Sequence, residues 1–415
     1  MNAISQTDPV TPIDAQVGQH CADALQRYLS ERGYARQTIG HYVGCTEHFF
    51  RWAERSRLGL GRIDEQAIGH FLDDHLTHCD CGWRTRCDRG ESRAALAHLL
   101  LILRTLGLVG TRPARLTPVE EELRRFDEHM DQVRGLAPVT RTGVLRVVRG
   151  LLRTRFGSGP VVVSRITSEQ VRECFERMSK RCQAPASLGA LVSALRGYFR
   201  FRATAGDRMQ GLIGALSYPA NWQQASLPKS LTDEEIKRLV NALTWPGPST
   251  RRSAAMVRCG LDLGLRSGEI AALGLDDIDW RAGTLRLPKT KSRREQVLPL
   301  PEATGRALAA YLKYERPQTT HRQLFARHVA PREERVGSDL VRKSIRQAYQ
   351  RAGLPYTGSH LQRHTMARRL LGAGSSIKEV ADVLRHRSLN TTQIYAKLDS
   401  RNLRRVALPW PGSAS

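Results

Sequence analysis

A diverged internal repeat occupies the first half of this 415-residue chain. One copy opens a helix-like periodic segment at Gly33 to Thr38, and the other opens a similar segment at Gly135 to Thr140. Each copy then runs through a short segment with capping residues, led by Ile63-Asp64 and by Ile166-Thr167, into a helix rich in Ala, Leu and Arg. Chance similarity between amphipathic helices is the alternative. We interpret the repeat as two tandem units of four or five helices.

The repeat and the composition around it predict the domain organisation. We expect a flexible tail at residues 1–15, a first helical unit at 16–112, and a second helical unit with its linker at 113–220. The stretch 205–230 is rich in Gly, Pro, Ser and Gln, which is typical of a linker. The remaining residues, 221–415, form the C-terminal domain.

The C-terminal domain breaks the helical pattern once, between Ile278 and Leu300. Leu285 and Leu287 alternate with polar neighbours, a charged turn follows, and an apolar-polar alternation returns after it. This pattern predicts a β-hairpin with a basic tip. The predicted fold class is therefore mainly α with a small β-sheet or hairpin, in which two tandem helical units precede an α+β domain.

The chain is strongly basic. It carries 65 Lys and Arg residues against 40 Asp and Glu residues, a formal net charge of +25. A protein with this balance usually binds a polyanion, and arginine can hold phosphate oxygens in a bidentate geometry. A merely basic protein, such as a ribosomal type, is the alternative on charge alone.

The sequence favours a cytoplasmic protein without a membrane segment. Met1 to Pro9 show no basic cluster followed by an apolar run, so no signal peptide is expected. The longest strongly apolar run is Leu99 to Leu103, far too short to cross a bilayer. We therefore expect the eight cysteines to be reduced thiols rather than disulfides.

One spaced set of residues in the C-terminal domain concentrates the chemistry of the chain. Its members can bind a phosphodiester, attack it and protonate its leaving group: Arg266, Lys291, His360, Arg363, His364, His386 and Tyr395. The spacing of His360, Arg363 and His364 puts them on one face of one helix. A metal site at the two histidines is disfavoured, because no acid completes a ligand set and Arg363 would repel a cation.

The order of these residues resembles the catalytic domain of the tyrosine recombinases, the phage integrase family, over about residues 228–400. That family has an Arg, a hairpin Lys, His-x-x-Arg-His, a His or Trp, and a Tyr nine residues later. The matching positions here are Arg266, Lys291, His360, Arg363, His386 and Tyr395. The segment 135–155 also resembles the start of the family's core-binding helical domain, a SAM-like fold. An additional N-terminal helical unit with a cysteine insert departs from the family pattern.

The resemblance implies a role for each residue. Arg266 and Arg363 clamp the phosphate oxygens, and Tyr395 attacks phosphorus to form a 3′-phosphotyrosine. His360 is the candidate base or proton relay, and Lys291 protonates the departing 5′-oxygen. His386 donates a further hydrogen bond to the phosphate, while His364 and Glu269 orient the others. No cofactor is expected, because arginines neutralise the phosphate and rejoining reuses the energy of the covalent link.

Double-stranded DNA is the expected partner, together with self-association into a tetrameric synapse on DNA and companion recombinases. Six arginines are predicted to contact DNA: Arg93, Arg104, Arg141, Arg196, Arg293 and Arg294. The predicted function is that of a site-specific recombinase or integrase that mobilises a transposon or integrated element. The alternatives are a catalytically idle DNA-binding architectural protein and a topoisomerase-like nicking-closing enzyme.

A cysteine insert in the first helical unit gives a weaker signal. His78, Cys79, Cys81 and Cys87 lie within ten residues of one another. Zinc is conceivable there, but the Cys-x-Cys spacing is tighter than zinc sites usually show. The predicted site set therefore contains no metal, with Cys79, Cys81 and Cys87 as weak candidates, and the surrounding arginines are expected to contact the DNA backbone instead.

Overall fold

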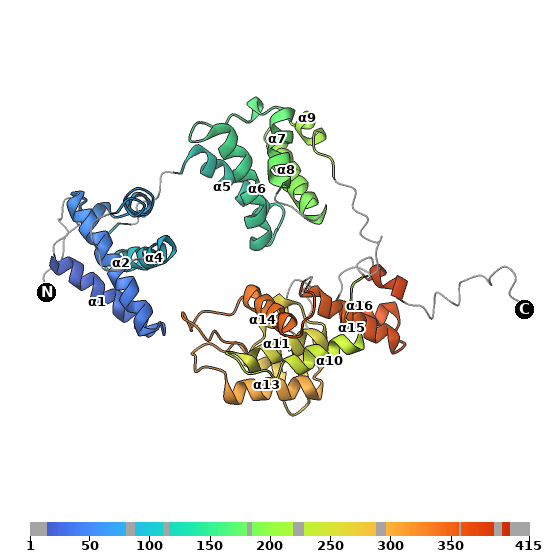
Figure 1. Cartoon of the computed structure of the whole chain (residues 1–415). Coiled ribbons are helices and arrows are strands. Elements are labelled where there is room, and N and C mark those ends of the chain that lie inside the picture. Colours follow the sequence, from blue (N-terminus) through green and yellow to red (C-terminus); the bar gives the residue numbers. More distant parts are fainter. Residues whose placement is uncertain are drawn as a thin grey trace, which may run out of the picture. The chain divides into compact units, whose positions relative to one another are not determined.

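The computed structural model describes residues 15–79, 88–110, 116–180, 185–218, 228–287, 296–356, 358–385 and 392–398. The chain divides into two compact units, Met1–Gly110 with Ser226–Ser415, and Thr111–Ala225. Within the described residues the structure is helical apart from one small sheet (Figure 1). No helix among them is long and apolar enough to cross a membrane.

The N-terminal part of the chain is a helical bundle with its own core. Asp64 starts one of its short helices by accepting a hydrogen bond from the Ala67 backbone N–H at 2.9 Å, as the sequence predicts. Phe49, Phe71 and Leu99 are fully buried at its centre, where α2 packs against α1 and α4 (Figure 1). Its elements are α1 (Ala15–Glu31), α2 (Arg36–Arg55), η1 (Leu60–Arg62), α3 (Glu65–His70), the π-helical turn η2 (Phe71–His75) and α4 (Arg89–Thr105).

The second helical unit repeats the order of a long helix, a capped shorter helix and a long helix. Thr167 and Gln170 form the predicted reciprocal cap of α7, with Thr167 Oγ1 accepting from the Gln170 backbone N–H. In its core the carboxylate of Glu122 accepts a 2.9 Å hydrogen bond from the buried Tyr198 hydroxyl. The elements are α5 (Pro118–Gln132), α6 (Pro138–Phe156), η3 (Val163–Arg165), α7 (Ser168–Ser179), α8 (Pro185–Thr204) and α9 (Gln210–Gly214).

The segment 205–230 differs from the predicted linker. Its first part contains α9, and Met209, Leu212 and Leu216 are buried in the core of the second unit. These three apolar residues are spaced by three and four positions, which is the helical period. The linker was predicted from the Gly and Ser content of the stretch, which does not reflect this spacing. The prediction of a linker is therefore wrong for residues 209–216, while residues 219–227 lie outside the described part of the chain.

The C-terminal domain is built around one buried helix, α11, which packs against α13, α14 and α15 (Figure 1). Met256, Val257 and Leu261 of α11 are fully buried. Thr232 and Glu235 form a reciprocal cap at the start of α10. The helices are α10 (Asp233–Ala242), α11 (Thr250–Leu263), α12 (Ser267–Ala272), η4 (Leu275–Asp277), α13 (Glu302–Tyr314), α14 (Ser338–Arg351), α15 (His360–Gly372), α16 (Ile377–Val383) and η6 (Gln393–Leu398).

The predicted β-hairpin is present as part of a three-stranded antiparallel sheet. The strands are β1 (Ile278–Asp279), β2 (Thr284–Leu287) and β3 (Gln296–Pro299), in the order β1-β2-β3. Leu285 pairs with Ile278 on one side and with Leu298 on the other, and the three side chains are buried in the domain core. The turn between β2 and β3, which carries Lys291, Arg293 and Arg294, lies outside the described residues.

Candidate active site

A left-handed turn sets the position of Arg266. Helix α11 ends at Gly264, whose φ of +60° is a conformation that glycine adopts at little cost. A Cβ at this position would also lie 2.7 Å from Cδ2 of Leu384, so a larger residue would meet both strain and a clash. The turn leaves Arg266 at the start of α12, where Glu269 accepts from the Arg266 backbone N–H at 2.8 Å and from Nη1 at 2.6 Å.

Three guanidinium groups converge on the same turn. Arg363 donates from Nη1 to the Gly264 carbonyl at 2.8 Å, and Arg385 donates from Nη2 to that carbonyl at 3.3 Å and to Glu269 at 2.9 Å. Arg363 and Glu269 are 3% and 5% exposed. Of the described residues, Glu269 is the acid ion-paired with Arg266 and Arg385. The cluster therefore buries more positive than negative charge.

The unbalanced charge is visible in the electrostatics of Arg363. Burial, followed by the positive charges of Arg266 and Arg385, lowers the pKa of Arg363 below its ordinary value. Its Nη2 atom is buried and has no hydrogen-bond partner among the described residues. Burial alone would raise the pKa of Glu269, but the neighbouring Arg385 and Arg266 outweigh it and lower that pKa. A buried donor and surplus positive charge together fit an anion that binds here.

Tyr395 lies against this cluster on η6. The pKa of Tyr395 is raised to about 12 by burial, although Arg363 and Arg266 oppose the rise. The pKa of His364 is lowered to about 4 by burial and by the nearby His360 and Arg363. The imidazole is therefore neutral and the phenol protonated near pH 7, and the Tyr395 hydroxyl lies 2.7 Å from Nδ1 of His364 in a hydrogen bond. The hydroxyl is the donor in this bond when the imidazole proton is on Nε2. The side chain of Tyr395 is 1% exposed, so its hydroxyl is held inside the domain.

His360 begins α15 and faces an open pocket. Burial, Arg363 and Arg266 lower its pKa, and its ring centroid lies 6.5 Å from that of His364. Arg266, directly before α12, and two arginines of α14 line the pocket with it. The lining residues are Arg266, Ser267, Gly268, Ser338, Arg342, Arg346, Gln350, Leu354, Tyr356, Gly358, Ser359 and His360. This concave, basic surface next to Arg266 suits a nucleic-acid backbone.

The structure thus brings together most of the residues that the sequence singled out. Arg266, Glu269, Arg363, His364 and Tyr395 form one connected group, and His360 borders it. The shared helix predicted for the two histidines and Arg363 is confirmed as α15. Lys291 and His386 lie outside the described residues, so their predicted roles stay predictions.

The histidine that contacts the Tyr395 hydroxyl is not the one expected from the sequence. His364, expected only to orient its neighbours, makes the hydrogen bond to the Tyr395 hydroxyl. His360 was the expected base. Tyr395 itself lies in the 3₁₀ helix η6.

Three arginines of this region were not among the site residues predicted from the sequence. Arg385 directly precedes His386 and joins Glu269 to Gly264, with a φ of +55° that the sequence does not reveal. Arg342 and Arg346 are four residues apart on α14, and both side chains line the pocket. Their helical spacing within a basic segment was the available signal.

The arginines predicted to contact DNA differ in their surroundings. Arg93 is exposed, whereas Arg104 pairs with Glu65 at 2.8 Å. Arg141 pairs with Asp127 and Asp131. Arg196 donates to the Leu216 carbonyl at 3.4 Å and lies over the ring of Tyr218. Arg293 and Arg294 are outside the described residues, and all six DNA contacts stay predictions.

The thiols follow the sequence-based expectation with one exception. Cys21, Cys79, Cys174 and Cys259 are free, as expected for a reduced protein, but Cys45 is disulfide-bonded. Local sequence gives no means of seeing this, because a disulfide depends on which distant thiols the fold brings together. Of the weak metal candidates, Cys79 is described, and Cys81 and Cys87 are not.

The chain is similar to known proteins over the region that contains this site. The model of the phage integrase family matches residues 229–401, which include every residue of the spaced set. The protein y4rA of Sinorhizobium fredii, described as an integrase/recombinase, is 32% identical over 392 residues, which cover 93% of this chain and 93% of that protein.

Solved structures show a similar fold. One is the Tn1549 transposon integrase in complex with transposon right end DNA, with a TM-score of 0.53 and 16% identity over 69% of this chain and 99% of that chain. Another is a lambda integrase tetramer bound to a Holliday junction, with a TM-score of 0.50 and 19% identity over 71% of this chain and 88% of that chain.

Proposed function

The chain belongs to the phage integrase family of tyrosine recombinases, and on that basis we propose that it cleaves and rejoins double-stranded DNA at specific sites through a 3′-phosphotyrosine at Tyr395. The observation that carries this proposal is the surplus of buried positive charge beside that hydroxyl, with Nη2 of Arg363 still free of a hydrogen-bond partner among the described residues. A scissile phosphate supplies the missing charge and the missing acceptor. We further propose that the substrate is the end of a transposon or another integrated element.

Arg266 and Arg363 bind the phosphate. Attack on phosphorus concentrates negative charge on the non-bridging oxygens, and fixed donors in a buried site stabilise that charge strongly. Each such donor contributes about 3–4 kcal/mol in comparable sites. Glu269 holds Arg266 through two hydrogen bonds, at 2.8 and 2.6 Å, so that this guanidinium need not reorganise during the reaction.

His364 positions the nucleophile. With Tyr395 protonated and the neutral imidazole 2.7 Å away, the hydroxyl proton has an acceptor already aligned. The positive neighbours that lower the pKa of His364 are neutralised when a phosphate binds, which favours the imidazolium form. We therefore assign the first proton-accepting contact to His364, and we assign His360, which lines the pocket, to the phosphate and to relay of the proton.

The bond changes balance without an added cofactor. The Tyr395 oxygen forms a bond to phosphorus, its proton passes to histidine, and the bond from phosphorus to the 5′-oxygen breaks. Lys291 gives a proton to the departing 5′-oxygen, and His386 donates a hydrogen bond to the phosphate; both assignments rest on the order of residues in the motif. The reverse sequence, with a new 5′-hydroxyl as the nucleophile, rejoins the strand.

The two helical units and the basic pocket supply the binding surface. Arg342 and Arg346 border the site on α14 and extend the positive surface for a DNA backbone. We propose that the helical units embrace the site in duplex DNA, that the protein self-associates into a tetrameric synapse there, and that companion recombinases take part. The lambda integrase tetramer on a Holliday junction supports the tetrameric assembly by similarity of fold. A cytoplasmic location belongs to the same proposal.

A nicked suicide substrate tests the chemistry. The native chain is expected to form a covalent protein–DNA adduct on the element's own end sequence, and Tyr395→Phe is expected to bind that DNA without forming the adduct. Tyr314→Phe serves as the control, because this tyrosine is 61% exposed and takes no part in the site. An adduct with Tyr395→Phe would exclude Tyr395 as the nucleophile. A native chain without any adduct would favour an idle DNA-binding protein, and an adduct without strand exchange would favour a topoisomerase-like enzyme.

A further inference from the structure

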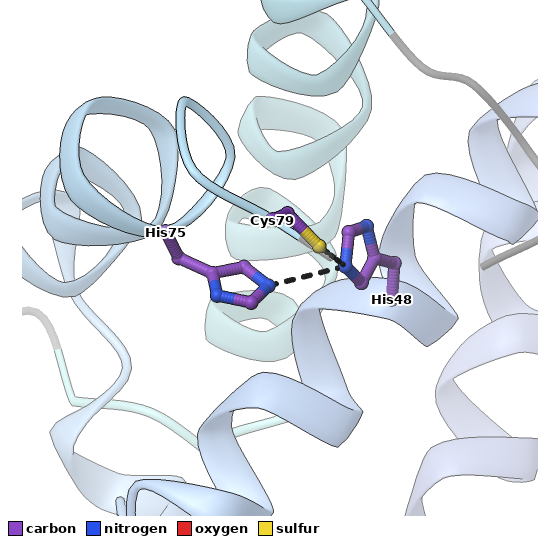
Figure 2. A group of neighbouring side chains, drawn as sticks. All are labelled: His48, His75 and Cys79. Carbon is purple, nitrogen blue, oxygen red and sulfur yellow. Dashed lines mark hydrogen bonds between the residues drawn. The ribbon is translucent and has the colours of Figure 1, made fainter. Parts of the chain in front are cut away.

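Two histidines and a cysteine meet in the N-terminal helical bundle, which the proposed chemistry does not use. His48 lies in α2, His75 ends η2, and Cys79 follows in the turn after η2. Nε2 of His48 is 3.2 Å from Nε2 of His75 and 3.4 Å from Sγ of Cys79 (Figure 2). The three potential ligand atoms all lie within 4.8 Å of one another.

These separations fit a tetrahedral zinc ion. Zinc lies about 2.0–2.1 Å from a histidine nitrogen and about 2.3 Å from a cysteine sulfur. At a tetrahedral angle, those bonds place two nitrogens about 3.3 Å apart and a nitrogen and a sulfur about 3.6 Å apart. The two distances from Nε2 of His48, 3.2 and 3.4 Å, are each within about 0.2 Å of these values.

Hydrogen bonding explains the arrangement less well. Nε2 of a neutral imidazole carries either one proton or one lone pair, so it makes one linear hydrogen bond. Both His75 and Cys79 approach that single nitrogen of His48, as Figure 2 shows. A cation at the common centre accounts for both approaches at once, because each of the three atoms then directs its own lone pair to the metal.

The surroundings favour ligation. His48 is 5% exposed, and the ring centroid of Phe71 lies 5.2 Å from that of His48 and 5.3 Å from that of His75. Arg51 and Arg55 lie on the same helix as His48 and act electrostatically on its imidazole. The cysteine supplies a thiolate when it binds a metal and releases its proton, which offsets the nearby arginine charge.

The backbone conformation gives an independent indication of a functional site here. η2 is a π-helical turn that directly follows α3, and isolated π turns inside helices occur frequently at functional sites. The wider turn ends at His75, the residue that faces His48. The spacing of His75 and Cys79, with three residues between them, also suits two ligands on one zinc.

We propose that His48, His75 and Cys79 form a structural zinc site that fastens η2 and the following turn to α2. The set differs from the weak sequence candidates, since it keeps Cys79 and takes its other two ligands from residues 48 and 75. Three protein ligands leave the fourth position of a tetrahedral ion to water or to a group outside the described residues. We assign the zinc ion a structural role, because it would join α2 and η2 within a small core. It would also compensate the polar side chains of its ligands, which are otherwise costly to bury.

Metal analysis of the full-length protein tests the site. Protein purified without chelators and dialysed against metal-free buffer is expected to retain one zinc ion per chain by plasma mass spectrometry. His48→Asn, His75→Asn and Cys79→Ser are expected to lose it. His70→Asn is the matched control, because His70 is an exposed histidine of the same bundle that pairs with Asp74. A native chain without zinc, or zinc retained in both His48→Asn and His75→Asn, would overturn the proposal.

A second measurement covers the case in which the variants fold poorly. Cobalt(II) replaces zinc in the native chain and reports its ligands directly, through the visible bands of a tetrahedral site and a near-ultraviolet thiolate charge-transfer band. We expect both signals to saturate at one cobalt per chain, and the thiolate band to disappear in Cys79→Ser. Octahedral cobalt spectra without a thiolate band would contradict the site. Loss of metal in Cys81→Ser or Cys87→Ser, with retention in both histidine variants, would move the metal to the cysteine insert and also overturn it.

Discussion

Arg363 and Glu269 belong to one buried charge cluster, and we expect the loss of each to have a different effect on stability, while the loss of Arg363 also slows cleavage. Arg266 and Arg385 hold the Glu269 carboxylate at 2.6 and 2.9 Å, and Arg363 adds a third positive charge nearby. Arg363→Met removes surplus positive charge. Glu269→Gln removes the negative charge that the arginines share.

The magnitudes follow from the contacts. Arg363→Met loses the hydrogen bond to the Gly264 carbonyl, a charged bond of about 1.5–3 kcal/mol, although Arg385 still donates to that oxygen. The side-chain replacement also removes the desolvation cost of a poorly compensated buried charge, which is several kcal/mol, so we expect the net change to be near zero. Glu269→Gln leaves buried guanidinium groups without their partner, which costs about 3–5 kcal/mol.

Two assays on the full-length variants separate these effects. Urea titrations followed by circular dichroism compare unfolding midpoints, and single-turnover cleavage of a suicide substrate gives the chemical rate. Arg363→Met is expected to unfold near the native midpoint and to cleave about 10²–10³-fold more slowly, since one anion-binding donor is lost. Glu269→Gln is expected to unfold at clearly lower urea concentration.

The control for this pair is Arg369→Met. Arg369 lies on the same helix, its side chain is 47% exposed, and it should tolerate the same replacement with little change in cleavage. If Arg363→Met destabilised the protein as much as Glu269→Gln, the buried positive charge would be fully compensated in the free protein. The argument for an anion site would then lose its electrostatic basis.

Further expected outcomes follow from the same contacts. Lys291→Ala should regain cleavage on a 5′-bridging phosphorothiolate, which leaves without a proton; equal impairment on both substrates would reassign the acid. The pKa of His364 is lowered from 6.5 to about 4, so the stability that its neutral form gives the folded protein is complete above pH 6.5 and declines toward pH 4. The melting temperature of His364→Asn should therefore depend less on pH in that window than the melting temperature of the native chain. A pH profile identical to that of the native chain would contradict this assignment. Gly264→Ala should lower the melting temperature through about 1–2 kcal/mol of left-handed strain plus the clash with Leu384, and unaltered stability would show that the turn relaxes. DNA binding should weaken with salt at a log–log slope of about 0.9 per phosphate contacted, and a fragment of residues 221–415 should lose much of that slope if the helical units hold the duplex.

Local sequence signals predicted the local structure well. The caps at Asp64 and Thr167 and the strands around Leu285 depend on neighbours within a few residues, and each is present. The helix α9 was missed because glycine, proline and serine dominate its surroundings, and only the buried positions of Met209 and Leu212 reveal it. Composition describes a segment as a whole, whereas a helix needs only a few correctly spaced apolar residues.

The site was predicted as a set of residues but not as a network. Order along the chain identified Arg363 and Tyr395, but it could not show that His364 holds the Tyr395 hydroxyl or that Arg385 bridges Glu269 and Gly264. The first contact joins residues more than thirty positions apart in the sequence, and the contacts of Arg385 join residues more than a hundred positions apart. All of them depend on how α11, α15 and the C-terminal turn pack together. The cluster at His48 was missed for the same reason, since sequence proximity grouped the cysteines with one another instead.

The identity and polarity of the covalent bond distinguish a 3′-phosphotyrosine at Tyr395 from every other chemistry. A suicide-substrate adduct, digested with nuclease and then trypsin, should place the residual nucleotide mass on the peptide Ser388–Lys397, in which Tyr395 is the one tyrosine. The DNA strand should be joined through its 3′-phosphate, so that a label on the 5′-side of the cleaved bond stays with the protein. Nucleotide mass on any other peptide, or a link to the 5′-phosphate, would contradict the account.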